Sequence, residues 1–211
     1  MKVNCLLSGL VWLIGPLMLI IFWHKRTKAP FFPALIAIPV CFAVFFFAGV
    51  IRSDNTGGNA ILYYIRNGLL YGVLEEGSKF LVFRFLLSEY ATAKNAVTYS
   101  IGHGGFEALG AAFSCFELIG KGTASPYILP MNLWSFAQGA LSCISLTVII
   151  VYGIRKGRSR FTLPAAVALH AFSNATAGIF ITPVAVGIRT VLTAGECFAA
   201  YRLEKNSSKV R

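Results

Sequence analysis

The sequence predicts an all-α membrane protein, a polytopic helical bundle of about seven transmembrane helices that forms one domain over residues 1–211. Two observations support this fold class. Of the 211 residues, 56% are hydrophobic and only 13% are charged, whereas soluble domains have about 25% charged residues. In addition, the chain contains seven apolar runs, each near the roughly 20 residues needed to cross a hydrocarbon core of about 30 Å.

The seven runs are separated by short polar or glycine-containing breaks, and no internal repeat relates them. Their predicted spans are 5–24, 31–51, 62–87, 95–118, 128–153, 161–181 and 185–203. Only Lys2 precedes the first run, and no small-x-small cleavage site follows it, so we interpret this run as a retained helix rather than a signal peptide. The short break at Thr182-Pro183 predicts a tight hairpin between the last two helices.

Basic residues fall mainly on one side of the predicted bundle. The breaks and flanking helix ends after runs one, three, five and seven contain Lys25, Arg26, Lys28, Arg84, Lys94, Arg155, Lys156, Arg158, Arg160, Arg202, Lys205, Lys209 and Arg211. The opposite side contains Lys2, Arg52, Lys121 and, at helix ends, Arg66 and Arg189. Because cytoplasmic loops are enriched in Lys and Arg, we expect the N-terminus outside and the C-terminus in the cytoplasm.

The net charge of +11 is explained by these loops. No basic stripe is interleaved with aromatic residues, so we do not expect a nucleic-acid partner. The five cysteines, Cys5, Cys41, Cys115, Cys143 and Cys197, occur singly within apolar segments without a C-x-x-C pair. This pattern predicts small packing residues rather than disulfides or metal ligands.

The third run contains three ionisable residues in an otherwise apolar segment: Glu75, Glu76 and Lys79. A charge in the hydrocarbon core costs at least a few kcal/mol, so such residues are usually functional and have partners on other helices. Lys79 is three or four residues from the two glutamates and can neutralise one of them on the same helix face.

Two further runs contain polar pairs at helical spacing. His103 and Glu107 in the fourth run, and His170 and Asn174 in the sixth, are each spaced i, i+4 and share a helix face. From the predicted helix ends, Glu75, His103 and His170 lie about 18, 12 and 13 Å from the cytoplasmic side at a rise of about 1.5 Å per residue. The three helices therefore bring their polar groups to one layer of the membrane.

Two histidines with several carboxylates are typical ligands of a catalytic zinc, which commonly leaves one position for water. We predict His103, Glu107 and His170 as metal ligands and zinc as the metal. Either Glu75 or Glu76 would then activate water for attack on a peptide carbonyl, and Asn174 would stabilise the oxyanion. Without an H-E-x-x-H motif, the site must assemble from three helices.

At these positions the chain resembles the YhfC family of intramembrane metalloproteases, and more distantly the CAAX-processing, bacteriocin-processing and PrsW-like membrane proteases. The resemblance rests on Glu75-Glu76-x-x-Lys79-Phe80, His103-Gly104-Gly105-Phe106-Glu107 and His170-x-x-x-Asn174, in this order. It implies an integral protein of the bacterial cytoplasmic membrane that cleaves peptide bonds of a membrane protein or peptide. The catalytic core would be Glu75, Glu76, His103, His170 and Asn174.

Less specific interpretations remain open at this stage. The polar groups can form a structural ion pair and interhelical hydrogen bonds in a noncatalytic scaffold or immunity-type protein. They can also form a proton relay in a transporter, although such folds usually contain repeats. Among the other polar residues, Glu196 can reach the cavity, Glu117 lies about 15 Å beyond Glu107 along the helix, and His24 is expected at the membrane interface.

Overall fold

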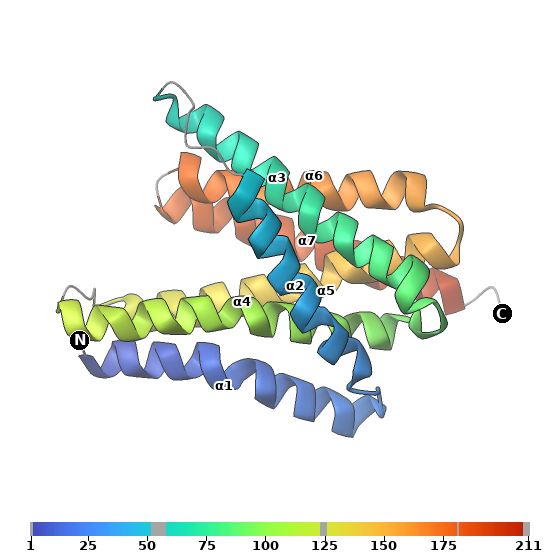
Figure 1. Ribbon diagram of the computed structural model, residues 1–211, viewed down its shortest axis with the longest axis horizontal. Coiled ribbons are helices and arrows are strands. Elements are labelled where there is room, and N and C mark those ends of the chain that lie inside the picture. The colour runs from blue at the N-terminus through green and yellow to red at the C-terminus, as the bar shows by residue number, and fades with distance from the viewer. Residues whose placement is uncertain (1, 52–57, 123–125, 181, 209–211) are drawn as a thin grey trace.

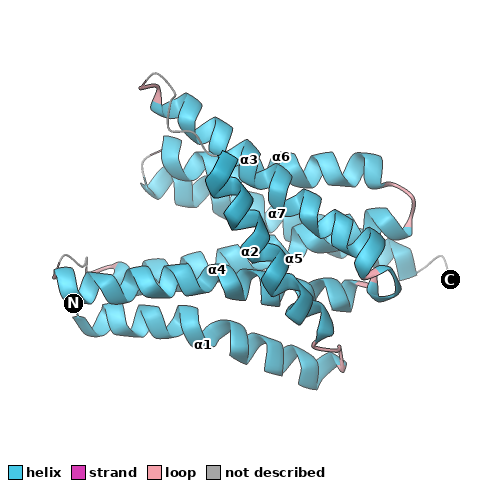
Figure 2. Ribbon diagram, viewed as in Figure 1, coloured by secondary structure: helices cyan, strands magenta, loops and turns pink. Residues whose placement is uncertain are grey.

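The computed structural model describes residues 2–51, 58–122, 126–180 and 182–208, and this part of the chain is helical without a β-strand. The α-helices are α1 (Lys2–Thr27), α2 (Phe32–Ile51), α3 (Ala60–Leu81), α4 (Ala93–Lys121), α5 (Ile128–Arg155), α6 (Ser159–Ile179) and α7 (Thr182–Ser208). The all-α fold class is therefore confirmed, as Figure 2 shows. Three of the basic residues used to predict the membrane orientation, Arg52, Lys209 and Arg211, lie outside the described residues.

The largest departure from the predicted spans is at the end of the third helix. The sequence predicts one helix through Leu87, but α3 ends at Leu81 and is followed by a π-helical turn, η1 (Val82–Leu86), and a 3-10 turn, η2 (Ser88–Tyr90). The Leu87 amide donates to the Val82 carbonyl over 2.7 Å, which is the wider i→i+5 bond of a π-turn. Hydropathy does not detect this change because, apart from Arg84, the residues from Leu81 to Leu87 stay apolar.

Several helix ends are explained by local side-chain and glycine chemistry. The Asn59 side chain accepts a hydrogen bond from the Leu62 amide at the start of α3, and Thr92 does the same for Asn95 at the start of α4. Such caps satisfy amide groups that have no partner within the helix. At the end of α4, Gly122 adopts a left-handed conformation (φ 68°), which glycine reaches without steric cost.

The helices pack as two closely associated pairs that are joined by the others. α1 lies alongside α4 and α3 lies alongside α6, while α2 crosses obliquely in front of α3 and α4, and α5 and α7 pack together behind (Figure 1). The beginning of α1 and the end of α7 lie at opposite ends of the long axis (Figure 1).

Small residues allow the closest helix contacts. A Cβ atom at Gly68 would lie 2.5 Å from the Ala171 carbonyl oxygen, and one at Gly72 would lie 2.8 Å from the Val167 carbonyl oxygen, so α3 contacts the α6 backbone directly. At Gly102, a Cβ atom would lie 2.5 Å from the Ala34 carbonyl oxygen, which brings α2 against α4. Close backbone approach through small residues is typical of membrane helix pairs.

The outer surface of the bundle is apolar. Exposed large hydrophobic side chains include Phe42, Phe46, Phe85, Phe113 and Phe198. Four helices, α1, α2, α5 and α7, are long and apolar enough to cross a membrane by length and composition. The polar residues that form the candidate site lower the hydropathy of α3, α4 and α6, which explains why these three helices fall outside that set.

We expect Gly68→Ala to destabilise the protein by about 1–3 kcal/mol, because the added methyl group must push α3 away from the α6 backbone. Thermal unfolding of the purified protein in detergent measures the effect. Gly77→Ala in the same helix is the matched control, since nothing lies within 4 Å of a Cβ atom there. Equal stability of the two variants would contradict the close α3–α6 contact.

Candidate functional site

The two adjacent glutamates of α3 have different environments. Glu76 and Lys79 are fully buried, and their side chains form an ion pair of 2.7 Å between Lys79 Nζ and Glu76 Oε1. Glu75 is 6% exposed and forms part of the wall of a cavity. The predicted neutralisation of one carboxylate by Lys79 is thus observed, and the neutralised group is Glu76.

His170 connects α6 to both glutamates. Its Nδ1 lies 2.6 Å from Glu76 Oε1, and its Nε2 lies 3.7 Å from Glu75 Oε2. Because an ionised carboxylate only accepts hydrogen bonds, Nδ1 carries the proton and donates to Glu76. In neutral His170 the lone pair is then on Nε2, and it faces the Glu75 carboxylate.

His103 of α4 approaches the same carboxylate from the opposite side. Its Nε2 lies 3.5 Å from Glu75 Oε2 and 3.2 Å from Glu107 Oε1. The His103 side chain is fully buried, yet neither ring nitrogen makes a hydrogen bond of good geometry with the described residues. Buried polar atoms are nearly always satisfied in native proteins, so the carboxylate contacts of this imidazole leave room for a bound group to complete its interactions.

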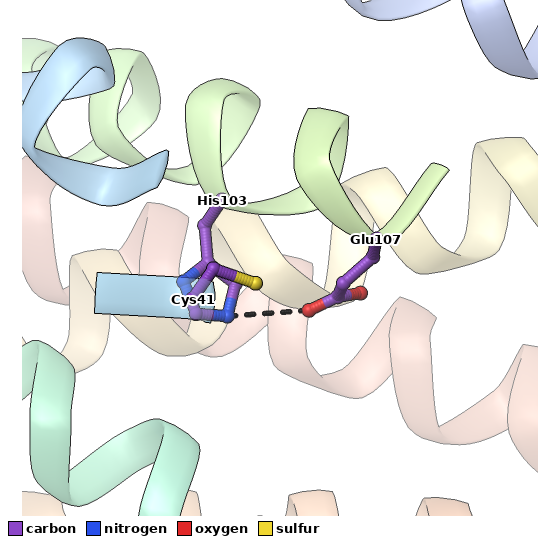
Figure 3. A group of neighbouring side chains, drawn as sticks. All are labelled: Cys41, His103 and Glu107. Atoms are coloured by element: carbon purple, nitrogen blue, oxygen red, sulfur yellow. Dashed lines mark ion pairs between the residues drawn. The ribbon is translucent and has the colours of Figure 1, made fainter. Parts of the chain in front are cut away.

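A cysteine from α2 lies beside this histidine. The Cys41 sulfur, a His103 ring nitrogen and a Glu107 carboxylate oxygen all lie within 4.8 Å of one another. Figure 3 shows these three side chains together, with the ion pair between His103 and Glu107 marked by a dashed line. Glu75, Glu76 and His170 form a second group at the same spacing.

The structure thus brings the polar residues of α3, α4 and α6 together, but it divides the predicted metal ligands. His103 and Glu107 belong to one group and His170 to the other, with Glu75 between the two histidines. Zinc and the set His103, Glu107 and His170 stay predictions.

A cavity of about 460 Å³ adjoins these groups, within the usual size range of ligand sites. Glu75, Glu107, His170 and Asn174 form part of its wall, together with Lys79 and residues of α5 and α7. The polar residues from α5 and α7 are Gln138, Ser142, Cys143, Arg189 and Thr193. Asn174 therefore lines the same cavity as Glu75 and His170, and its oxyanion role stays a prediction.

Sequence reasoning did not identify the contributions of α2 and α5, and from α7 it named only Glu196. Cys41 occurs in an apolar helix and is indistinguishable there from a packing residue. Ser142 donates a hydrogen bond of 2.6 Å to Glu196, which is 2% exposed and lies behind the cavity wall. The sequence analysis expected Glu196 to reach the cavity, but this residue is not among those that line it.

The donor set fits a divalent cation. Lys79 offsets the charge of Glu76, which leaves the carboxylates of Glu75 and Glu107 beside two imidazoles. Carboxylate oxygen and imidazole nitrogen are both zinc ligands, and the His103 nitrogens make no hydrogen bond of good geometry that a metal would have to displace. The lone pairs that His170 Nε2 and Glu75 direct at each other also require a proton or a cation between them.

The fold and the site together define a helical integral membrane protein with a buried acid–histidine centre. Residues 11–113 match the family model of the YhfC intramembrane metalloproteases, which confirms the predicted resemblance for this part of the chain. The matched segment is slightly under half of the sequence and includes Cys41, Glu75, Glu76, His103 and Glu107, but not His170. No curated protein and no solved structure matches the chain.

We expect Lys79→Met to destabilise the protein by about 3–5 kcal/mol, because it leaves the buried Glu76 carboxylate without its cation. The double variant Glu76→Gln/Lys79→Met should recover much of this loss, as measured by thermal unfolding in detergent. Lys121→Met is the control, since it removes an ion pair with Glu117 in which both side chains are more than half exposed and which therefore adds little. A double variant no more stable than Lys79→Met would contradict this account.

Proposed function

We propose that the protein is an intramembrane protease that hydrolyses peptide bonds of membrane proteins or peptides with a glutamate-activated water. One observation is the main support. The Glu75 carboxylate lies at the cavity wall between two imidazoles, 3.5 Å from His103 and 3.7 Å from His170. The family match over residues 11–113 supports the same class of enzyme.

Glu75 is the better candidate for the general base. Oε1 of Glu76 already accepts from both Lys79 and His170, and its side chain lies outside the cavity lining described above. Glu75 faces the cavity and has no comparable cationic partner on its own helix. A general base must lie within hydrogen-bond reach of the water that it deprotonates, and Glu75 has access to that space.

Zinc is the proposed metal, with His103, Glu107 and His170 as the ligands predicted from sequence. A bound divalent cation supplies electrostatic stabilisation of the carbonyl oxygen and increases the acidity of water. The Nδ1–H bond of His170 to Glu76 would orient its Nε2 toward the site, as partners of ligand histidines commonly do.

The proposed reaction is hydrolysis. The water oxygen bonds to the carbonyl carbon while its proton passes to Glu75, and the charge on the carbonyl oxygen is stabilised by the Asn174 side-chain amide. The carbon–nitrogen bond then breaks, and Glu75 returns the proton to the departing nitrogen. The products are a carboxylate and an amine.

To test catalysis, the purified protein is reconstituted in liposomes and given a library of hydrophobic peptides. We expect cleavage, and a loss of about 10²–10⁴-fold in Glu75→Gln because the base is removed. A zinc chelator should also abolish cleavage, and added zinc should restore it. Glu117→Gln, an exposed residue of α4, is the control and should retain full activity.

Absence of cleavage in the wild type would favour the noncatalytic scaffold. Unchanged activity in Glu75→Gln and His103→Gln would contradict the proposed site. Proton uptake by the liposomes without peptide cleavage would favour a transporter.

We further propose that all seven helices cross a bacterial cytoplasmic membrane, with the N-terminus outside and the C-terminus inside. The described basic residues support this orientation, since Lys25, Arg26, Arg155 and Arg158 flank helix ends on the predicted cytoplasmic side. The exposed apolar surface supports contact with lipid.

Reporter fusions test the orientation. A fluorescent protein that folds only in the cytoplasm should fluoresce when fused after Lys28 or after the C-terminus. Alkaline phosphatase, which is active only outside, should be active when fused after Gly122. The opposite pattern would show that the orientation is inverted.

A further inference from the structure

We propose that Cys41 is a metal ligand, and that Cys41, His103 and Glu107 together form the metal site. This inference rests on the proposed metalloprotease function and specifies its ligands differently, with a thiolate from α2 in place of His170. The three donor atoms lie within 4.8 Å of one another, and the three side chains converge in Figure 3.

The state of His103 is the first argument. Its side chain is fully buried, and neither ring nitrogen makes a hydrogen bond of good geometry with the described residues. A buried polar group without a hydrogen bond destabilises the folded state. Nε2 lies 3.2 Å from Glu107 Oε1 and 3.5 Å from Glu75 Oε2 without hydrogen-bond geometry, and a metal bound through one ring nitrogen would satisfy that nitrogen.

The position of Cys41 is the second argument. The cysteine is fully buried and lies two residues after Pro39 in α2. The close contact of Gly102 with the Ala34 backbone holds α2 against α4 one residue before His103. The fold therefore places a thiol beside the unsatisfied imidazole.

The donor types and their number are the third argument. Thiolate ligands favour zinc over magnesium or calcium, and three protein ligands with one open position are typical of catalytic zinc. Glu107 also forms part of the cavity wall, so the site borders the space where substrate would bind.

This assignment gives the two groups different roles. Cys41, His103 and Glu107 bind the metal, while Glu75 remains the base, 3.5 Å from His103. His170 becomes a positioning residue that donates to Glu76 and faces Glu75 with its second nitrogen.

Cobalt substitution tests the ligand set independently of catalysis. Metal-free full-length protein in detergent is titrated with Co²⁺, and absorption is recorded in the near-ultraviolet and the visible range. We expect a thiolate-to-cobalt charge-transfer band in the wild type, which nitrogen and oxygen ligands do not produce. Cys41→Ser should lose the band. It should also bind cobalt at least about 10-fold more weakly, since replacing residues that only hydrogen-bond to metal ligands already weakens metal binding by about 10–100-fold.

Two controls make the result specific. Cys143→Ser should keep the band, although Cys143 also lies at the cavity wall. A variant in which Cys5, Cys115, Cys143 and Cys197 are all replaced by serine or alanine should also keep it, and this variant does not depend on whether Cys41→Ser folds.

The possible outcomes separate the inference from the proposed function. Cobalt binding without a thiolate band, or a band that persists in Cys41→Ser, overturns the role of Cys41 and leaves a metalloprotease with other ligands. Failure of the wild type to bind cobalt or zinc overturns both the inference and the metal-dependent part of the proposed function.

Discussion

The site depends on one carboxylate oxygen that accepts hydrogen bonds from two side chains at once. Oε1 of Glu76 contacts Lys79 at 2.7 Å and His170 at 2.6 Å, in a region that solvent does not reach. Electrostatic interactions are stronger there than in water, and an unpaired charge would be costly. The same contact fixes the rotation of α6 relative to α3 and the tautomer of His170.

The pairing of Glu76 explains why two adjacent glutamates occur in a membrane helix. Neighbouring residues on a helix point about 100° apart, so the two carboxylates have different contacts although both lie beside His170. Glu76 faces Lys79 and His170, whereas Glu75 faces the cavity. The Glu76 carboxylate thereby joins α3 to α6, and the Glu75 carboxylate stays accessible from the cavity.

The sequence was sufficient to predict the all-α fold, the helices that contain the polar residues, and the meeting of Glu75, His103 and His170 at one depth. These properties depend on hydropathy and on the rise per residue. The grouping of His103 with Cys41 rather than with His170 depends on the rotation of each helix and on the oblique crossing of α2, which periodicity does not specify. The π-turn after Leu81 was missed because, Arg84 apart, its residues are as apolar as those of the preceding α-helix.

The division of the helices into α3 with α6 and α4 with α1 and α2 has a mechanical consequence. Glu76, Lys79 and His170 lie within the α3–α6 pair, which glycine contacts hold together, whereas His103, Glu107 and Cys41 lie on α4 and α2. The Glu75–His103 contact crosses the boundary between them. The Glu75–His103 distance therefore depends on how the two units are placed relative to each other, whereas the Glu76 contacts depend on the α3–α6 pair alone.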